Sequence, residues 1–232
     1  CMDKNKYTIG RTYLKMSRNI LAIGAHSDDV EFGCGGTLIK HVSNGDNVHI
    51  LIMSNGDVKH SVTGKSIRTV DDTNSECKCA ADKMGVNLIQ LDFPDREVPF
   101  NSESITAIEK VINEHGIDTV YTHWGGDTHQ DHINTLRSSL SASRLVNNVL
   151  GYEQVPVPRV TNVYPVANYY VDITDFMDTK IEACKCHTSQ ILKYENMGVD
   201  MIDGLNILAR YRGNQIRKKY AEAFDVLKMV AV

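Results

Sequence analysis

Two clusters of ionisable side chains each follow an apolar run that is typical of a β-strand. The run at residues 20–25 leads directly into a histidine and two aspartates within residues 26–29. The run at 119–122 leads into residues 123–132, which hold three histidines and two aspartates. Ligands bind where parallel strands end, so the two clusters can converge on one edge of a sheet.

Histidine nitrogens and carboxylate oxygens are ligands of catalytic zinc, which takes three protein ligands and keeps a fourth position open. His129 and His132 are three residues apart, so they can share one face of a helix. An isolated H-x-x-H pair is often a surface feature, and residues 26–29 alone could form a strand-end turn that caps a helix. Found together at two strand ends, the clusters favour a catalytic metal site.

Alternating apolar and helical segments predict the elements that position these clusters. Strands are expected at 20–25, 48–53, 88–91 and 119–122, and helices at 36–42, 71–84, 102–115 and 132–148. Strands that alternate with helices at this spacing pair in parallel, which predicts a doubly wound α/β sheet. Two short strands, 161–164 and 169–172, and a helix from an Asp175 cap to residue 194 are expected to follow. Residues 1–232 show no linker or repeat and are interpreted as a single domain.

The composition excludes several classes of protein. With 42% hydrophobic and 23% charged residues, the chain is an ordinary globular sequence rather than a disordered one. The net charge of -4 argues against a general nucleic-acid binder. No apolar run approaches the ~18 residues of a membrane span, and the polar N-terminus lacks a signal-peptide core. We therefore expect a cytoplasmic protein without a stable membrane anchor.

Six cysteines are present, four of them in two C-x-C pairs at residues 77–79 and 184–186. Neither pair has the C-x-x-C spacing of a zinc ribbon or a redox site. Since no secretion signal is evident, all six are predicted to be reduced thiols.

The motifs "AHSDD" at 25–29 and "HQDH" at 129–132 resemble those of the PIG-L/LmbE-like metal-dependent de-N-acetylases, usually A-H-P-D-D and H-x-D-H. The similarity continues through "GCGGTL", "LDFPD", "HTSQ" and "YAEAF" and so covers nearly the whole chain. The resemblance implies a Rossmann-like α/β fold, a mostly parallel sheet flanked by helices, with a C-terminal extension. It also implies hydrolysis of an acetamide, usually on an N-acetylglucosaminyl group.

Carried over by position, the resemblance implies three zinc ligands, in a site where other divalent metals are also possible: His26, Asp29 and His132. Asp28 becomes the general base, because it is the neighbouring carboxylate left free to take a proton from water that the metal activates. His129 becomes the group that meets the developing oxyanion or protonates the leaving amine. Asp131 is expected to orient His129.

Two departures from the family pattern concern the substrate side. Ser27 stands where the family usually has proline. Thr73 stands where an arginine that grips sugar hydroxyls is expected, and Arg68 is the candidate to replace that arginine. The competing interpretation of Arg68 is a solvated loop residue.

Three further residues are candidates for contact with substrate, each with a structural alternative. Asp95 resembles a sugar-hydroxyl acceptor but could belong to a Pro-Asp turn. Asp127 could hydrogen-bond near the metal or cap a loop. His187 could reach the site or pack within a helix. His123 is expected in the core or behind the metal ligands.

The expected substrate is a small soluble amino-sugar glycoside, such as an aminoglycoside precursor or a thiol-cofactor precursor, and a homo-oligomer is possible. One alternative is a metal hydrolase of another amide or ester. Another is a sugar- or metal-binding protein that has lost catalysis. A dinucleotide site at "GCGG", 33–36, is disfavoured because the spacing is not G-x-G-x-x-G and acids precede it.

Overall fold

The computed structural model describes residues 17–59, 63, 66–155 and 166–231, which form a seven-stranded sheet with helices on both faces and a separate two-stranded hairpin. The strands are β1 Asn19–Gly24, β2 Asn47–Ser54, β3 Val58–Lys59, β4 Ser66–Arg68, β5 Asn87–Phe93, β6 Thr119–His123, β7 Asn148–Tyr152, β8 Tyr169–Asp172 and β9 Ala221–Lys228. The helices are α1 Asp29–Ser43, α2 Val70–Met84, α3 Ser102–Glu114, α4 Gln130–Ala142, α5 Met177–Cys184, α6 Thr188–Glu195 and α7 Met201–Gln215.

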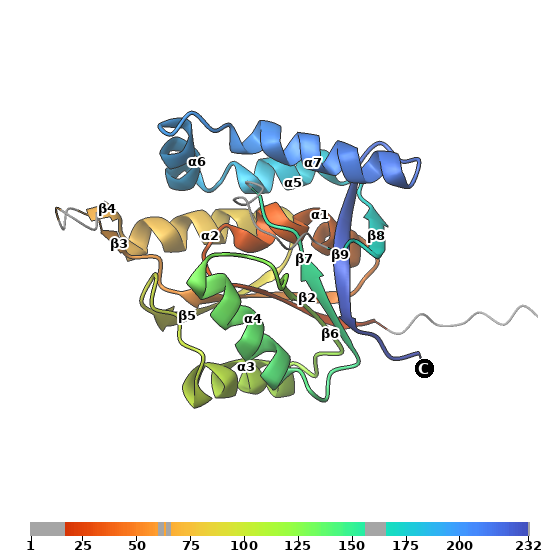
Figure 1. The fold of residues 1–232 in the computed structure, drawn as a ribbon, viewed down its shortest axis with the longest axis horizontal. Helices are drawn as coiled ribbons and strands as arrows, with labels where there is room; N and C mark the ends of the chain where they lie inside the picture. The colour runs from red at the N-terminus through yellow and green to blue at the C-terminus, as the bar shows by residue number, and fades with distance from the viewer. Residues whose placement is uncertain (1–16, 60–62, 64–65, 156–165, 232) are drawn as a thin grey trace, which may run out of the picture.

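The large sheet has the order β5-β2-β1-β6-β7-β9-β8. The strands from β5 to β7 pair in parallel, and β9 runs antiparallel between β7 and β8. Helices α3 and α4 cover one face, while α1 and α2 cover the other, with α5 and α7 lying outside them (Figure 1). This arrangement confirms the predicted mostly parallel α/β fold. None of the described helices has the length and apolar character that crossing a membrane requires.

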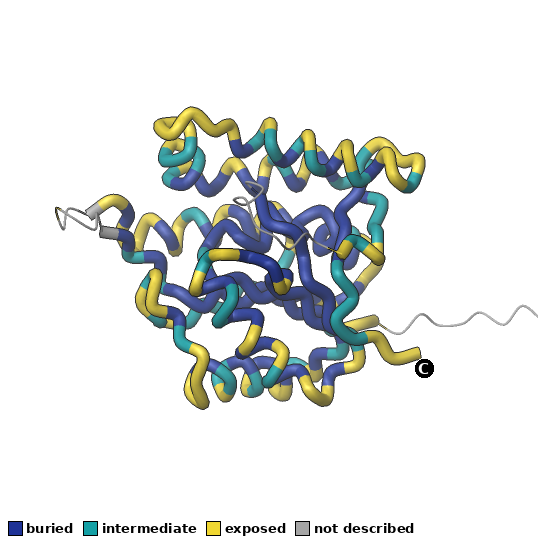
Figure 2. Tube along the Cα trace, viewed as in Figure 1, coloured by how far each residue is buried: buried dark blue, intermediate teal, exposed yellow. Residues whose placement is uncertain are grey.

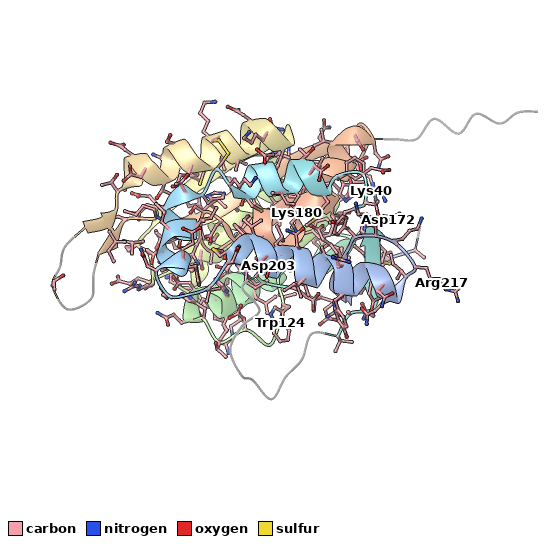
Figure 3. The ribbon with its side chains drawn as sticks, turned by 90° about the horizontal axis from the view of Figure 1, so that it is seen from above. Lys40, Trp124, Asp172, Lys180, Asp203 and Arg217 are labelled. Atoms are coloured by element: carbon pink, nitrogen blue, oxygen red, sulfur yellow. A yellow bond between two sulfur atoms is a disulfide. The ribbon has the colours of Figure 1, made fainter. Side chains whose placement is uncertain are left out.

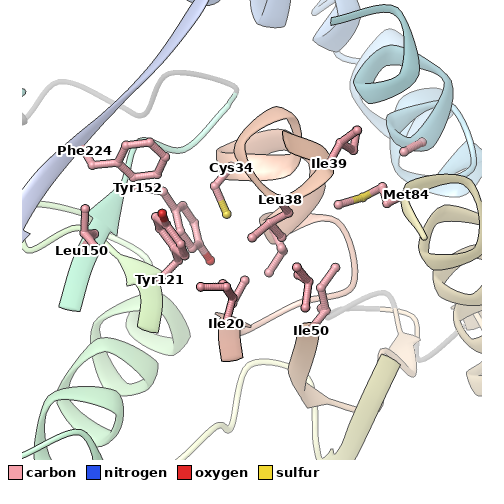
Figure 4. Packing of buried hydrophobic residues seen from close by; sticks show 14 of the residues in the cluster. Ile20, Cys34, Leu38, Ile39, Ile50, Met84, Tyr121, Leu150, Tyr152 and Phe224 are labelled. Carbon is pink, nitrogen blue, oxygen red and sulfur yellow. The ribbon is translucent and has the colours of Figure 1, made fainter. Parts of the chain in front are cut away.

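The central strands are buried along most of their length (Figure 2). On the α1 side, Ile20 and Ile50 from the sheet pack with Leu38 of α1, and Tyr152 and Phe224 extend the same cluster (Figure 4). A second cluster joins the opposite sheet face to α3 and α4. Because helices cover both faces, the strands are continuously apolar rather than alternating, and β1 rigidly supports the loop at its carboxyl end.

Helix α1 is interrupted at Cys34, whose backbone is not helical (φ −139°, ψ 15°). The amides that follow the break donate to one carboxylate: Gly36 and Thr37 lie 2.9 and 2.7 Å from the two Glu222 oxygens. Lys180 of α5 lies 2.5 Å from that carboxylate and 2.9 Å from the carbonyl oxygen of Phe32 (Figure 3). Glu222 therefore acts as a cap for the second half of α1 from a strand 186 residues away.

The glycines of "GCGG" allow α1 to pack closely against neighbouring side chains. A Cβ added to Gly33 would lie 2.3 Å from the Tyr152 ring, and one added to Gly36 would lie 2.8 Å from Ile173. Side chains at these positions would push α1 away from the sheet and from the segment after β8. No nucleotide is needed to explain this run.

Several expected boundaries differ from the structure. Helix α1 begins at Asp29, immediately after the first cluster, rather than at residue 36. The helix predicted at 132–148 ends at Ala142, and residues 148–152 form strand β7, whose short apolar run suits either conformation. The helix expected up to residue 194 breaks around His187 into α5 and α6.

The C-terminal part holds two elements that the sequence interpretation missed, α7 and β9. The strand predicted at 169–172 is present as β8, whereas the one predicted at 161–164 lies outside the described residues. Both β8 and β9 complete the sheet at its antiparallel edge.

One pair of cysteines forms a disulfide, so the prediction that all six are reduced is wrong. Cys79 of α2 and Cys186 after α5 are bonded, with Cα atoms 5.8 Å apart (Figure 3). Cys34, Cys77 and Cys184 are free and buried. The bonded pair is 107 residues apart, and the C-x-C spacing carries no signal for it. The cytoplasmic location stays a prediction.

Candidate active site

Both sequence clusters lie at the carboxyl edge of the sheet, on two neighbouring strands. Strands β1 and β6 pair in parallel with Ala22 opposite Tyr121. The loop after β1 carries the first cluster into α1, and the loop after β6 carries the second into α4. Parallel neighbours end at the same edge, so the two loops meet there.

Three donor groups converge at this meeting point. His26 Nδ1 lies 3.2 Å from His132 Nε2 and 3.4 Å from Asp29 Oδ2. His132 Nε2 lies 3.3 Å from Asp29 Oδ1. The donors of a tetrahedral zinc with bonds of about 2.0–2.1 Å are themselves about 3.3 Å apart. The residues expected as metal ligands therefore have the donor types and separations that suit such an ion.

Carboxylates hold the outward-facing nitrogens of both imidazoles. Asp131 Oδ2 lies 3.0 Å from His26 Nε2, and Asp127 Oδ2 lies 2.8 Å from His132 Nδ1. Each carboxylate can accept the ring N–H, which leaves the inward nitrogen with a lone pair to offer a metal. Asp127 was expected to hydrogen-bond near the metal or to cap a loop. Its Oδ2 lies beside His132 Nδ1 and its Oδ1 accepts the backbone N–H of His129 at 2.8 Å, so it contacts a candidate ligand and also caps the loop.

The position of Asp131 corrects one expectation. Its carboxylate is buried, and besides His26 it accepts the backbone N–H groups of Arg96 and Val98 at 2.7 and 3.3 Å. It does not bond the ring of His129 as predicted; there the backbone N–H of Asp131 donates to Nδ1. The reason is local: His129 is the N-cap of α4, and its ring accepts from a free amide of the first turn.

This cap also sets the tautomer of His129. A backbone N–H can only donate, so Nδ1 must accept and a neutral ring carries its proton on Nε2. Burial and the nearby His26 and His132 lower the pKa of His129 to about 4, which favours the neutral ring. His129 thus presents an N–H donor beside the ring of His26, at 4.8 Å between centroids.

The carboxylates around His26 and His132 stabilise positive charge at the donor cluster. Burial opposes protonation of His26, but hydrogen bonds to Asp131 and Asp29 raise its pKa to about 10. Burial likewise opposes protonation of His132, whereas Asp29 and Asp127 raise its pKa to about 9. Burial acts against ionisation of Asp29, yet His132 and His123 hold its pKa well below the ordinary value. A divalent cation would take the place of these protons.

His123 lies behind the donor cluster, as expected. It is fully buried, its Nε2 accepts the backbone N–H of Ala25 at 3.0 Å, and its ring stacks on His132 at 4.2 Å. Among the described residues, two groups bring potential ligand atoms within 4.8 Å: His26, His129 and His132, and Asp29, His123 and His132. His123 Nε2 and His129 Nδ1 are occupied by backbone amides, which favours His26, Asp29 and His132 as the donor set.

A cavity of about 420 Å³ opens from the donor cluster. Its described lining is His26, Asp28, Asp29, Val58, Asp95, Arg96, Asp127, His129, His132, Gln154, Val155, Gln190, Lys193, Tyr194 and Met197. Asp28 is the N-cap position of α1 and is 8% exposed, which places a carboxylate directly beside the donors without joining them. The cavity therefore brings together the candidate metal donors, a further acid and the His129 ring.

Arg68 is not a solvated loop residue. It is 3% exposed, and its guanidinium donates to Ser27 Oγ at 3.0 Å and to the Gly56 carbonyl at 3.1 Å. Asp95, which lines the cavity, lies 4.0 Å away. Ser27, the departure from the proline of the family motif, is thus the residue that anchors Arg68 next to Asp28.

His187 does not reach the cavity, so its expected contact with substrate is wrong. It is fully buried, and its Nε2 lies 3.5 Å from Glu31 Oε1 on the inner side of α1. Burial acts against protonation of His187, but Glu31 raises its pKa. Gln190 of the same "HTSQ" motif lines the cavity instead. Its amide oxygen, when turned toward Arg68, accepts from both terminal guanidinium nitrogens.

Two cavity residues carried no usable sequence signal. Gln154, just after β7, donates from Nε2 to Asp29 Oδ1 at 3.0 Å. Arg96, just after β5, has a left-handed backbone (φ 67°) and supplies its amide to Asp131. Both act through loops whose conformation depends on neighbouring elements, so neither composition nor spacing could reveal them.

Comparison with known proteins gives a consistent picture. The sequence model of a family described as PIG-L, GlcNAc-PI de-N-acetylase, matches residues 21–143, which include both clusters. The uncharacterized deacetylase YaiS of Escherichia coli is 32% identical over 143 residues, 59% of this chain and 74% of that protein. The diacetylchitobiose deacetylase of Thermococcus kodakarensis is 28% identical over 223 residues, 88% and 81% of the two chains.

Among solved structures, the 4-carboxy-2-hydroxymuconate hydratase GalB of Pseudomonas putida superposes with a TM-score of 0.77. It is 20% identical, and the match covers 93% of this chain and 98% of that one. At this identity the likeness concerns the fold alone. The same scaffold therefore carries more than one chemistry, and the site itself must support any functional conclusion.

Proposed function

Because the chain belongs to the PIG-L family of deacetylases, we propose that it is a zinc-dependent hydrolase of an N-acetylglucosaminyl-type amino sugar. Water adds to the acetamide carbonyl and the C–N bond breaks. One proton of the water completes the amine and the second leaves the acetic acid for that amine, so acetate and an ammonium group are released. The observation that carries the proposal is the convergence of three metal donors, Asp28 and His129 in one cavity.

The metal would be held by His26, Asp29 and His132, whose donor atoms lie 3.2 to 3.4 Å from one another. A bound zinc ion supplies Lewis acidity, which lowers the pKa of water and polarises a carbonyl oxygen. Asp131 and Asp127 keep the two imidazoles in the tautomer and orientation that this binding needs. Gln154 donates a hydrogen bond to Asp29 Oδ1, the oxygen that also faces His132.

Two cavity residues would handle protons and charge. Asp28, which lines the cavity beside the donors, accepts the proton of the attacking water. His129 donates its Nε2–H to the carbonyl oxygen as negative charge develops there. The proton that Asp28 accepts balances the one that the departing nitrogen requires.

The sugar would be bound by the wall beside Asp28. Asp95 offers a carboxylate to sugar hydroxyls, and Arg68 together with Gln190 forms a buried polar surface behind it. These groups suit a small polar substrate such as an amino-sugar glycoside. A cytoplasmic location fits such a substrate and belongs to the same proposal.

The test is turnover of methyl N-acetyl-β-D-glucosaminide by the zinc-loaded protein, with acetate and free amine measured together. Equal release of both, abolished by a chelator and restored by zinc, is the expected result. Cleavage of acetyl esters without cleavage of the acetamide would favour the alternative hydrolase. Stoichiometric zinc binding without turnover of any N-acetylated sugar would show that the protein binds its ligands but does not catalyse hydrolysis.

A further inference from the structure

Helix α6 presents one face to the cavity. Gln190, Lys193 and Tyr194 line it, and Met197 continues the row just past the end of the helix. These residues are spaced i, i+3, i+4 and i+7, the spacing of one side of a helix. This row of four residues, the α6 wall, is therefore a built surface of one helix rather than a collection of loop atoms.

The row runs from the buried interior to the cavity mouth. Gln190 is 8% exposed and lies against Arg68, whereas Met197 is 60% exposed. Its chemistry changes along the same direction, from a carboxamide to a phenol ring and a thioether. Lys193 folds over the Tyr194 ring, with Nζ 5.4 Å from the ring centroid.

Apolar side chains from other elements share the lining. Val58 of β3 and Val155 after β7 are both almost completely buried, at 7% and 1% exposure, and line the same cavity. The described lining thus combines polar and charged side chains, including the carboxylates and imidazoles of the donor cluster, with four less polar residues: Val58, Val155, Tyr194 and Met197.

Two contacts hold the beginning of α6 to α2. Glu76 accepts the backbone N–H and the hydroxyl of Ser189, both at 2.7 Å. The Cys79–Cys186 disulfide ties the turn just before α6 to the same helix. The beginning of α6 is consequently held against α2 before any ligand binds, and such preorganisation lowers the entropic cost of binding.

We propose that the α6 wall is a second subsite, one that receives an aromatic group attached to the acetamido sugar. This rests on the proposed function, because the acetamide must lie at the donor cluster and the rest of the molecule then extends along α6. Tyr194 contributes an aromatic face or edge, and Met197 a polarisable thioether that contacts rings favourably. A second sugar would be held mainly by several hydrogen bonds, whereas toward the mouth the wall offers the Lys193 ammonium and the Tyr194 hydroxyl beside an aromatic ring and a thioether.

The experiment compares kcat/KM for three soluble glycosides of N-acetylglucosamine: methyl, phenyl and N,N'-diacetylchitobiose. The phenyl glycoside is expected to exceed the methyl glycoside roughly tenfold, as partial burial of a ring predicts. In Met197→Ser and Tyr194→Ser the phenyl-to-methyl ratio should fall roughly three- to fivefold. Leu192→Ser is the matched control: Leu192 is an exposed apolar residue of α6 outside the cavity lining, and its ratio should stay at the wild-type value.

Each other outcome contradicts a defined part of the argument. Turnover of all three glycosides without a preference for the phenyl glycoside would contradict the subsite. An unchanged phenyl-to-methyl ratio in both variants would contradict it as well. Neither result would contradict the deacetylase activity. A preference for the disaccharide over phenyl would show that the wall receives a sugar. Absence of turnover on every glycoside would contradict the proposed function and this inference with it.

Discussion

The Asp131 carboxylate lies 3.0 Å from His26 Nε2, and the same carboxylate accepts the amides of Arg96 and Val98. A side chain of α4 thereby links a donor that follows β1 to the loop that follows β5. Arg96 adopts a left-handed backbone (φ 67°) in making this contact. The orientation of His26, a proposed metal donor, thus depends on three segments far apart in sequence.

Asp131→Asn should weaken zinc binding by about 10–100-fold, because the amide is a poorer acceptor for the His26 N–H and orients the ring less firmly. A competition titration with a chromogenic chelator measures the affinity directly. Asp82→Asn, which changes an exposed carboxylate of α2, is the control for the loss of one charge. An unchanged zinc affinity in Asp131→Asn would show that His26 is held by other contacts.

Asp28→Asn should keep zinc and the fold but lower turnover by about 10²–10⁴-fold, the usual contribution of a general base. Asparagine preserves the size of the side chain and removes the site that takes the proton. Metal content by elemental analysis and kcat on the acetamide are measured on the same preparation. Asp29→Asn, in contrast, should lose the metal. If Asp28→Asn lost the metal and Asp29→Asn kept it, Asp28 would be the metal ligand and Asp29 the general base.

Alkylation of the unreduced, denatured protein should label Cys34, Cys77 and Cys184 but leave Cys79 and Cys186 unlabelled. Peptide mass spectrometry identifies the modified positions. In Cys79→Ser, Cys186 should become reactive, and the melting temperature should fall, since a disulfide of this kind contributes typically about 2–4 kcal/mol. Labelling of Cys79 and Cys186 in the freshly purified wild-type protein would contradict the pairing.

The pH dependence of stability should report the cluster around Asp46. Burial acts against its ionisation, but hydrogen bonds from His41 and Arg18 outweigh that effect and lower its pKa. A depressed folded pKa means that the ionised carboxylate stabilises the protein above about pH 4, its ordinary pKa. That contribution is lost as the pH falls through the folded pKa.

Asp46→Asn should therefore lower the melting temperature most at neutral pH, and the difference from wild type should shrink below about pH 4. Differential scanning calorimetry across this range makes the measurement. Asp82→Asn, at an exposed position, should differ little from wild type throughout. A difference for Asp46→Asn that is the same at every pH would mean that the carboxylate acts through packing rather than charge.

Short-range patterns in the sequence were enough to determine several elements. The apolar runs of β1 and β6 and the periodicity of α2 and α3 depend on neighbours within a few residues, so those four elements were predictable. Gly85 and Gly116, which follow α2 and α3, have left-handed backbones (φ 72° and 57°). The adjacency of the two ionisable clusters could be predicted as well, because parallel strands must end at a common edge.

Partner choice among distant residues was decided only by the tertiary structure. The Asp131 carboxylate bonds the ring of His26 rather than that of His129. His187 is buried beside Glu31, and Cys79 pairs with a cysteine 107 residues away. Sequence spacing describes which groups can share a face, but not which face a neighbouring element covers. The ionisable groups of the site were visible in the sequence because their types are chemically distinctive; their partners were not, because burial and orientation arise only when the loops pack together.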